Sequence, residues 1–210
     1  LTTATTVKID EGSCNIPSPT GPTYYSYYGF RDWTIGDDEK LYAILGLNRQ
    51  YASISDLVLV VMDIRYEDVW TCLNTYDIST NSFGPYTGIS YDRSRDVIWV
   101  LHSIRKSITP YTFNSDGTFD RDTDMQYDFF SSYSEQNGLV AHNNMFFFRS
   151  KYNWAQDRLE AYAISGTSTT LVKQTGERSI SANGFGIYYN GARISLIDHY
   201  QWSARYYREY

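Results

Sequence analysis

A repeated pattern of glycine opening, polar turn and strand is the feature that most restricts the fold of this chain. Three openings consist of Gly, a large apolar residue, a small residue and an apolar or aromatic residue: Gly88–Tyr91, Gly138–Ala141 and Gly184–Ile187. A polar turn follows each opening, and then a strand-like run: Val97–Leu101, Met145–Phe148 and Arg193–Ile197. The opening glycines are 50 and 46 residues apart, a period typical of propeller blades and other repeats.

A third strand ends each repeat and carries a tyrosine at a nearly constant position. These strands are Ile108–Phe113, Leu159–Ile164 and Trp202–Tyr207. Tyr111, Tyr162 and Tyr207 lie 23 or 24 residues after their opening glycine. Each repeat is therefore predicted to be a small antiparallel sheet whose glycine marks the crowded innermost strand.

A divergent copy of the pattern precedes these three repeats. Asp32–Ile35 takes the place of the opening, Lys40–Leu45 that of the second strand and Asp56–Ile64 that of the third. Outer strands are expected at about Glu67–Leu73, Phe119–Asp128 and Thr169–Gln174. Residues 1–210 are thus predicted to form one all-β domain, a four-bladed β-propeller of antiparallel blades. A β-sandwich and a fragment of a larger propeller are the alternatives.

The two chain ends suggest how such a ring closes. The last repeat stops after its third strand and so lacks an outer strand, whereas the N-terminus carries a spare strand-like segment, Thr3–Asp10, which is β-branched and alternates. We expect this N-terminal strand to complete the last blade. A disulfide between Cys14 and Cys72 would then clasp the closure, and it favours a secreted or extracellular location. Two unpaired thiols are the alternative.

Composition narrows the class of partner. The net charge is −6 and basic residues do not cluster, so we expect no nucleic-acid binding. The longest aliphatic run, Leu57–Met62, is too short to span a membrane, so no membrane insertion is expected. The 21 tyrosines are typical of recognition proteins. Trp33, Trp99 and Trp202 fall in predicted strands and are expected in the core.

One loop carries side chains suited to binding a sugar or a protein. The indole of Trp154 could stack on a pyranose ring, while its polar neighbours bind hydroxyl groups. The predicted ligand-binding residues of this loop are Tyr152, Asn153, Trp154, Gln156 and Asp157. Simple packing of the loop is the alternative.

A second set of candidate ligand-binding residues lies where second strands end: His102, Arg149, Asp198 and His199. Equivalent strand ends of a ring can converge on one mouth of its channel. The alternative is ordinary polarity at strand ends.

Three alternating carboxylates, Asp120, Asp122 and Asp124, form the nearest approach to a metal motif. Oxygen ligands at alternate positions can bind Ca²⁺. The same alternation is typical of a half-exposed outer strand, which is the alternative. No other cofactor is expected.

The function predicted from these patterns is that of a non-enzymatic extracellular module that recognises a glycan or a protein partner. The sequence contains no Gly-x-Ser-x-Gly elbow and no His-Glu-x-x-His spacing. A self-assembling structural or adhesive protein is the first alternative. A hydrolase that uses scattered carboxylates is the second.

Overall fold

The computed structural model describes residues 8–10, 14, 24–37, 39–49, 55–66, 69–78, 87–103, 105–114, 118–122, 125–129, 131, 135–153, 156–175, 178–179, 186–189, 194–199 and 205–209. Every regular element in these ranges is a β-strand, as the all-β prediction requires. None of the described segments forms a helix of the length and apolarity needed to cross a membrane.

The first sheet is built from the divergent first repeat. Its strands lie in the order β1 (Lys8–Asp10), β5 (Val69–Asp77), β4 (Ser55–Asp63), β3 (Lys40–Arg49) and β2 (Tyr24–Ile35). The predicted second and third strands of this repeat are confirmed as β3 and β4. Both are rich in Val, Leu and Ile, which suit a pleated sheet covered on both faces.

The second and third repeats each form one further sheet. The second sheet contains β10 (Tyr127–Asp128), β8 (Ser107–Phe113), β7 (Val97–His102) and β6 (Thr87–Asp92), with β9 (Phe119–Arg121) also paired to β8. The third contains β11 (Glu135–His142), β12 (Met145–Asn153), β13 (Gln156–Ser165) and β14 (Ser168–Gln174), with β15 (Arg178–Ser179) paired to β13. The predicted turn between β11 and β12 is confirmed, since Asn143 and Asn144 both have positive φ, as a two-residue hairpin requires.

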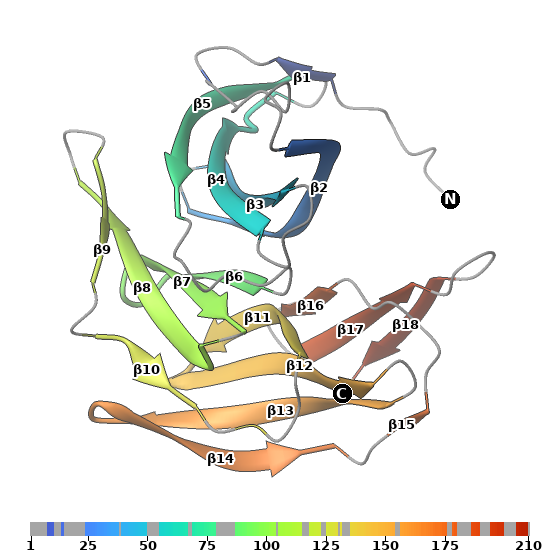
Figure 1. The fold of residues 1–210 in the computed structure, drawn as a ribbon. Coiled ribbons are helices and arrows are strands. Elements are labelled where there is room, and N and C mark those ends of the chain that lie inside the picture. Colours follow the sequence, from blue (N-terminus) through green and yellow to red (C-terminus); the bar gives the residue numbers. More distant parts are fainter. Residues whose placement is uncertain are drawn as a thin grey trace.

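The fourth sheet comprises β16 (Gly186–Tyr189), β17 (Ile194–His199) and β18 (Arg205–Glu209). The four sheets follow one another around a common centre (Figure 1). Their first strands meet in succession, β2 against β6, β6 against β11 and β11 against β16. Among the described strands β16 and β2 make no comparable contact, so the closed ring stays a prediction.

The N-terminal strand does not complete the last blade, and this part of the prediction is wrong. β1 pairs in parallel with β5 of the first sheet, with Lys8 opposite Val69 and Asp10 opposite Thr71. The cause is the short reach of the chain. Cys14, four residues after Asp10, is bonded to Cys72 on β5, and four residues span at most roughly 14 Å.

The fourth repeat begins two residues later than predicted. A Cβ placed on Gly88 would lie 2.7 Å from the backbone nitrogen of Leu139, and one on Gly138 would lie 3.0 Å from that of Ile187. Ile187 is therefore the structural equivalent of Leu139, and Gly186 opens the fourth repeat rather than Gly184. Tyr207 consequently pairs with Ile197, which lies opposite Gly186. Although Tyr207 has the same spacing in the sequence as Tyr111 and Tyr162, it does not occupy the equivalent position in its sheet.

The predicted outer strand Phe119–Asp128 is interrupted between β9 and β10. The Asp122 N–H donates to the Pro110 carbonyl (3.1 Å). The Asp122 carboxylate accepts the Met125 N–H (3.2 Å). The first bond joins Asp122 to β8 and the second closes a turn that starts at Asp122, so β9 and β10 are not one continuous strand.

Apolar layers between neighbouring sheets form the core. Along β7, Ile98 and Val100 face the first sheet, whereas Trp99 and Leu101 face Phe146 and Phe148 of the third sheet. Val140 and Leu159 pack against Ile187 of the fourth sheet. Each fully buried side chain of this size stabilises the fold by roughly 1.5–3 kcal/mol. These layers hold the first strands of the sheets close together at the centre.

Candidate functional site

The first strands of neighbouring sheets are joined by side-chain hydroxyl groups at equivalent positions of the repeat. The Tyr91 N–H donates to Thr34 Oγ1 (3.1 Å). One repeat later, the Ala141 N–H donates to Ser90 Oγ (2.9 Å). The next equivalent residue, Val140, has no hydroxyl and packs against Ile187 instead. These contacts fix the register of β2, β6 and β11 at the centre of the molecule.

Asp32 occupies the position at which the later repeats have glycine. Its carboxylate accepts the Ile89 N–H (2.9 Å) and is also hydrogen-bonded by the backbone N–H groups of Trp33 and Leu139. These three donors are equivalent, because each belongs to the residue that follows the opening position of its repeat. One side chain thus binds the first strands of three successive sheets.

Burial dominates the electrostatics of Asp32. The residue is 8% exposed, and this loss of solvation raises the pKa of its carboxyl to about 7 although the three N–H groups act to lower it. Asp32 therefore takes up or releases its proton near neutral pH.

Glycine is required at the equivalent positions because the strands approach closely there. A Cβ on Gly88 would lie 2.6 Å from the carbonyl carbon of Gly138. Gly138 has a φ of +63°, and a Cβ on it would lie 2.7 Å from Ile187 Cγ2. Of the openings at Asp32, Gly88 and Gly138, only the first therefore has room for a side chain at the centre.

Trp33 and Ile35 lie on the opposite side of β2, and both are exposed, by 58% and 50%. The residues equivalent to Trp33 are covered by the preceding sheet, and Ile89, Leu139 and Ile187 are only 1%, 2% and 6% exposed. The prediction of a core position is confirmed for Trp99, which is fully buried, and is wrong for Trp33. The side chain of Trp202 lies outside the described residues.

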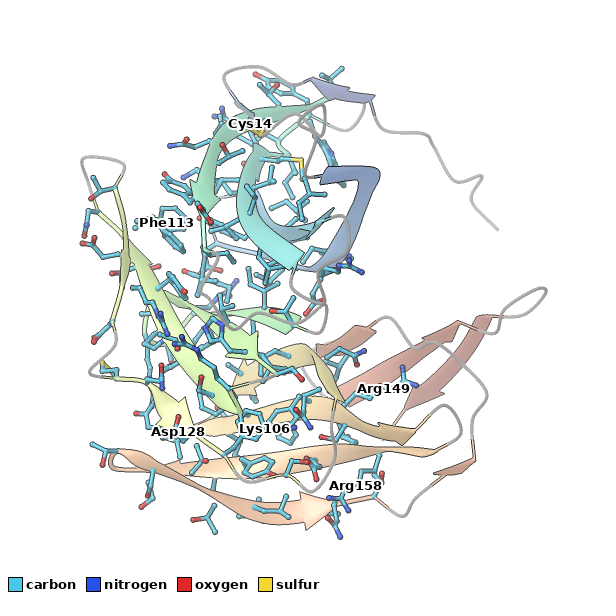
Figure 2. All side chains as sticks on the ribbon, viewed as in Figure 1. Cys14, Lys106, Phe113, Asp128, Arg149 and Arg158 are labelled. Carbon is cyan, nitrogen blue, oxygen red and sulfur yellow. A yellow bond between two sulfur atoms is a disulfide. The ribbon has the colours of Figure 1, made fainter. Side chains whose placement is uncertain are left out.

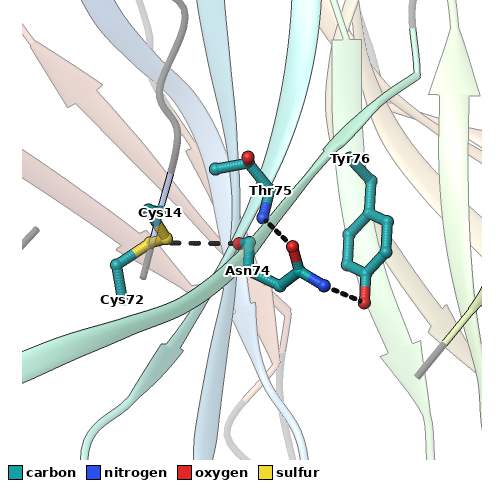
Figure 3. Close-up of a disulfide and its surroundings, with 5 residues drawn as sticks. All are labelled: Cys14, Cys72, Asn74, Thr75 and Tyr76. Atoms are coloured by element: carbon teal, nitrogen blue, oxygen red, sulfur yellow. Dashed lines mark hydrogen bonds between the residues drawn. A yellow bond between two sulfur atoms is a disulfide. The ribbon is translucent and has the colours of Figure 1, made fainter. Parts of the chain in front are cut away.

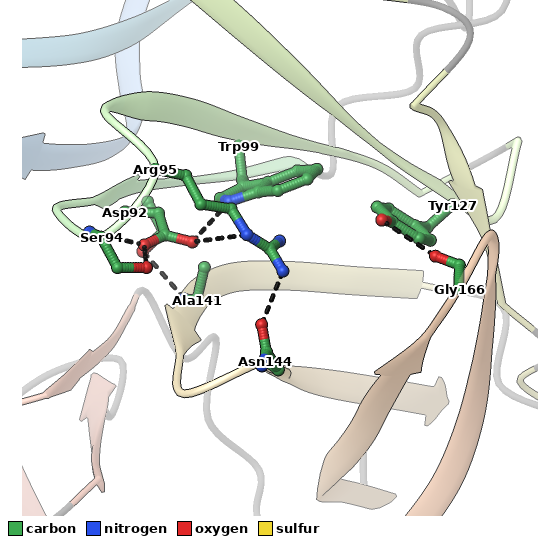
Figure 4. Close-up of polar contacts among 9 residues, drawn as sticks. Asp92, Ser94, Arg95, Trp99, Tyr127, Ala141, Asn144 and Gly166 are labelled. Carbon is green, nitrogen blue, oxygen red and sulfur yellow. Dashed lines mark hydrogen bonds and ion pairs between the residues drawn. The ribbon is translucent and has the colours of Figure 1, made fainter.

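Turns on one side of the molecule are linked from sheet to sheet. Arg93 forms an ion pair with Asp37 of the first sheet. Arg95 donates to Asn144 Oδ1 of the third sheet (2.6 Å) and lies 5.6 Å from the centre of the Trp99 ring. The Asp92 carboxylate accepts from Trp99 Nε1 (3.2 Å) and from Ser94, which orients this group (Figure 4).

A buried polar network joins the second and third sheets at the other end of their strands. Gln136 accepts hydrogen bonds from Lys106 and from the Ser103 hydroxyl. Burial lowers the pKa of Lys106. Nearby, the fully buried Glu160 accepts from Ser150 and Arg158. Figure 2 labels Lys106 and Arg158, both of which lie beside the third sheet in that view.

Of the four strand-end residues predicted to converge, His102 and Arg149 lie on described parts of different sheets. His102 is 1% exposed on the face of the second sheet that carries Ile98 and Val100. Its burial, with Arg121 and Arg105 nearby, lowers its pKa to about 3, so the imidazole is neutral. Arg149 pairs with Leu159 and so shares the face of the third sheet that packs toward the fourth. Asp198 and His199 lie in β17, and their side chains are outside the described part of the structure.

The other predicted binding residues lie around the junction of β12 and β13. Tyr152 and Asn153 end β12 and Gln156 and Asp157 begin β13, so they flank a turn, but their side chains and all of Trp154 are outside the described residues. The loop remains a predicted ligand site.

Two of the three candidate calcium ligands, Asp120 and Asp122, belong to the described residues. Asp120 accepts from Asn114 (2.6 Å), Asp122 caps the turn described above, and Asp124 lies outside the described residues. In the described ranges no three His, Cys, Asp or Glu side chains gather closely enough to hold an ion.

The predicted disulfide between Cys14 and Cys72 is confirmed, with Cα atoms 5.6 Å apart (Figure 3). It does not clasp the ring closure, because both cysteines belong to the first sheet and its N-terminal segment. It fastens that segment to β5, where Asn74 also binds the Tyr76 hydroxyl (2.9 Å). A disulfide is consistent with an extracellular location.

Sequence reasoning placed Asp32 in an inner strand but did not single it out as functional. The signal was present, because aspartate stands where three repeats have glycine. A charged residue in a position that excludes side chains elsewhere needs a compensating partner. One of its backbone donors is its chain neighbour Trp33, but Ile89 and Leu139 lie on two other strands far along the chain, and only the structure brings them together.

Comparisons with known proteins support the fold alone. No protein-family model matches the sequence, and no curated protein is significantly similar to it. A chain of a nidogen–laminin complex superposes with a TM-score of 0.50 at 14% identity, covering 80% of this chain and 56% of the other. An engineered GH43 glycoside hydrolase with endo-xylanase and exo-arabinofuranosidase activity superposes with a TM-score of 0.50 at 11% identity, covering 85% and 37%.

Both of these structures are propeller-like, and the fold of this chain is an all-β, propeller-like arrangement of antiparallel sheets. The chain spans 56% of the first of these structures and 37% of the second. At such identities the binding and catalytic properties of those proteins do not carry over to this one.

Proposed function

We propose that the protein is a non-enzymatic extracellular binding module that recognises a glycan or a protein partner. The observation that carries this proposal is the exposed strip of Trp33 and Ile35 on the first strand of the first sheet. Large apolar side chains held side by side on a rigid strand are a feature of recognition surfaces.

The surroundings of Trp33 favour a protein partner over a glycan. At the three equivalent positions, the apolar face of a preceding β-sheet covers the side chain. Ile35, two residues along, offers only apolar contact and no hydrogen bond to a sugar hydroxyl. A partner with an apolar surface therefore fits this strip. The glycan alternative depends on the loop around Trp154.

Matched variants test the proposal. Trp33→Ser removes the strip, and Val172→Ser removes a side chain of similar exposure, 51%, from the outer strand β14. Wild type and both variants are applied to a glycan array and to a panel of purified secreted proteins. We expect a protein ligand that wild type and Val172→Ser bind and that Trp33→Ser binds at least tenfold more weakly. Equal binding by all three proteins, or none on either platform, would contradict the proposal.

Self-association is a second candidate, favoured by β14. This strand is the edge of the third sheet, and its Leu171 and Val172 are 40% and 51% exposed. Exposed apolar edge strands tend to pair with other chains. Light scattering over a concentration series tests it. A monomer at every concentration excludes this role, and a mass that falls in Val172→Ser supports it.

A further inference from the structure

Three backbone N–H groups from three different sheets converge on one point at the centre of the molecule. They belong to Trp33 of β2, Ile89 of β6 and Leu139 of β11, and all three are hydrogen-bonded to the Asp32 carboxylate. Their equivalence in the repeat shows that the geometry comes from the packing of the sheets rather than from Asp32 itself.

Converging N–H groups form a site that suits a carboxyl group. Each N–H carries a partial positive charge and can donate to a carboxyl oxygen, while burial favours the protonated form of that group. The strands around this space bring glycine, hydroxyl and apolar side chains: Gly88, Ser90, Gly138 and Ile187. The charged residue next to Asp32 in the chain is Arg31, whose guanidinium lies over Gly46 of β3.

We propose that these three N–H groups form a carboxyl-binding site where the first strands of three sheets meet, that Asp32 fills it from within the chain, and that a small carboxylic acid can fill it instead when the Asp32 side chain is removed. Asp32 acts as an internal ligand that links the first three sheets. The site does not depend on the proposed recognition function, since Asp32 and Trp33 point to opposite sides of β2.

Removal of the side chain with addition of a small carboxylic acid tests the site. Asp32→Gly installs the residue that the other repeats have, so the backbone is compatible, and it empties the site. We expect formate or acetate at about pH 4, where much of each is protonated, to raise the melting temperature of Asp32→Gly by about 4 °C, with saturation, relative to chloride at equal pH and ionic strength. Wild type should not respond, because its site is filled.

A control separates this effect from general stabilisation by salts. Asp63→Gly removes a carboxylate that is hydrogen-bonded to Arg65 at a strand end, and its melting temperature should respond to formate no more than that of wild type does. An equal response of all three proteins, or no saturable response of a folded Asp32→Gly, would overturn the proposal.

A second measurement uses the wild-type protein and decides the question if Asp32→Gly does not fold. The amide resonances of Trp33, Ile89 and Leu139 are followed by NMR as the pH is changed. We expect all three to shift with one common midpoint in wild type and to lose that transition in Asp32→Asn. Separate midpoints, or a transition that persists in the variant, would overturn the proposal.

Discussion

Replacing Asp32 with asparagine should change how the stability of the protein depends on pH. Asparagine keeps the shape of the side chain and one carbonyl oxygen to accept the N–H groups, but it cannot ionise. The comparison therefore isolates the proton bound by the Asp32 carboxyl group.

The magnitude follows from the shift in pKa between the unfolded and folded chain. Burial raises the pKa of Asp32 from 3.8 to about 7, and a shift of about three units corresponds to about 4 kcal/mol. Below the lower value the carboxyl is protonated in both states, and its contribution to stability is fully present. As the pH rises, the unfolded chain loses the proton first, so this contribution falls by about 1.4 kcal/mol per pH unit and is lost above about pH 7.

Urea unfolding at half-unit steps between about pH 4 and pH 8 measures this effect. The free energy of unfolding of Asp32→Asn, minus that of wild type, should increase by up to about 4 kcal/mol across this range. A difference that does not vary with pH would refute the reasoning. The wild-type curve alone would not decide it, because His102 contributes a slope of the opposite sign.

Three further predictions concern other parts of the molecule. His102→Gln should lose less stability than wild type as the pH falls from 6.5 toward 3. The reason is that burial lowers the pKa of the imidazole to about 3, so proton uptake favours the unfolded chain. Acid titration followed by circular dichroism measures this, and parallel curves would argue against the burial of His102. Gly88→Ala should lower the free energy of unfolding by about 3 kcal/mol, because the new Cβ would meet backbone atoms. Gly46→Ala should lower it by about 1 kcal/mol or less, because the new Cβ would meet the flexible Arg31 side chain. Equal losses in thermal unfolding would contradict the crowding at the centre. The paired change Cys14→Ser and Cys72→Ser opens a loop with a sequence separation of 58 and should lower the free energy of unfolding by about 4 kcal/mol. Cleavage near the N-terminus in limited proteolysis should accelerate. Unchanged proteolysis would show that the disulfide does not fasten this segment.

The repeat could be predicted from the sequence because each hairpin is local. The continuous apolar run Val97–Leu101 and the turn at Asn143–Asn144 both act within a few residues. Such signals predict the all-β class and the approximate strands. The register of the fourth repeat depends instead on the contact between Gly138 and Ile187, which nothing within that repeat specifies.

The position of the N-terminal strand and the central site depend on contacts between distant segments. The partner of β1 is determined by the bond from Cys14 to Cys72, and the spacing of the two cysteines predicted the bond but not its consequence. Trp33 has the pattern of a core residue, and its exposure follows only from which sheet lies beside β2. The role of Asp32 requires three sheets to be assembled first, so its sequence context alone could not reveal it.

The most direct test of the central claim, that Asp32 is buried among the strands of three sheets, is the titration of its side-chain carboxyl carbon by ¹³C NMR, with the resonance assigned by its absence from Asp32→Asn. The structure predicts a midpoint of about 7, since burial outweighs the three hydrogen bonds. A midpoint near the ordinary value of 3.8 would show a carboxylate open to water and would contradict this account of the centre of the molecule.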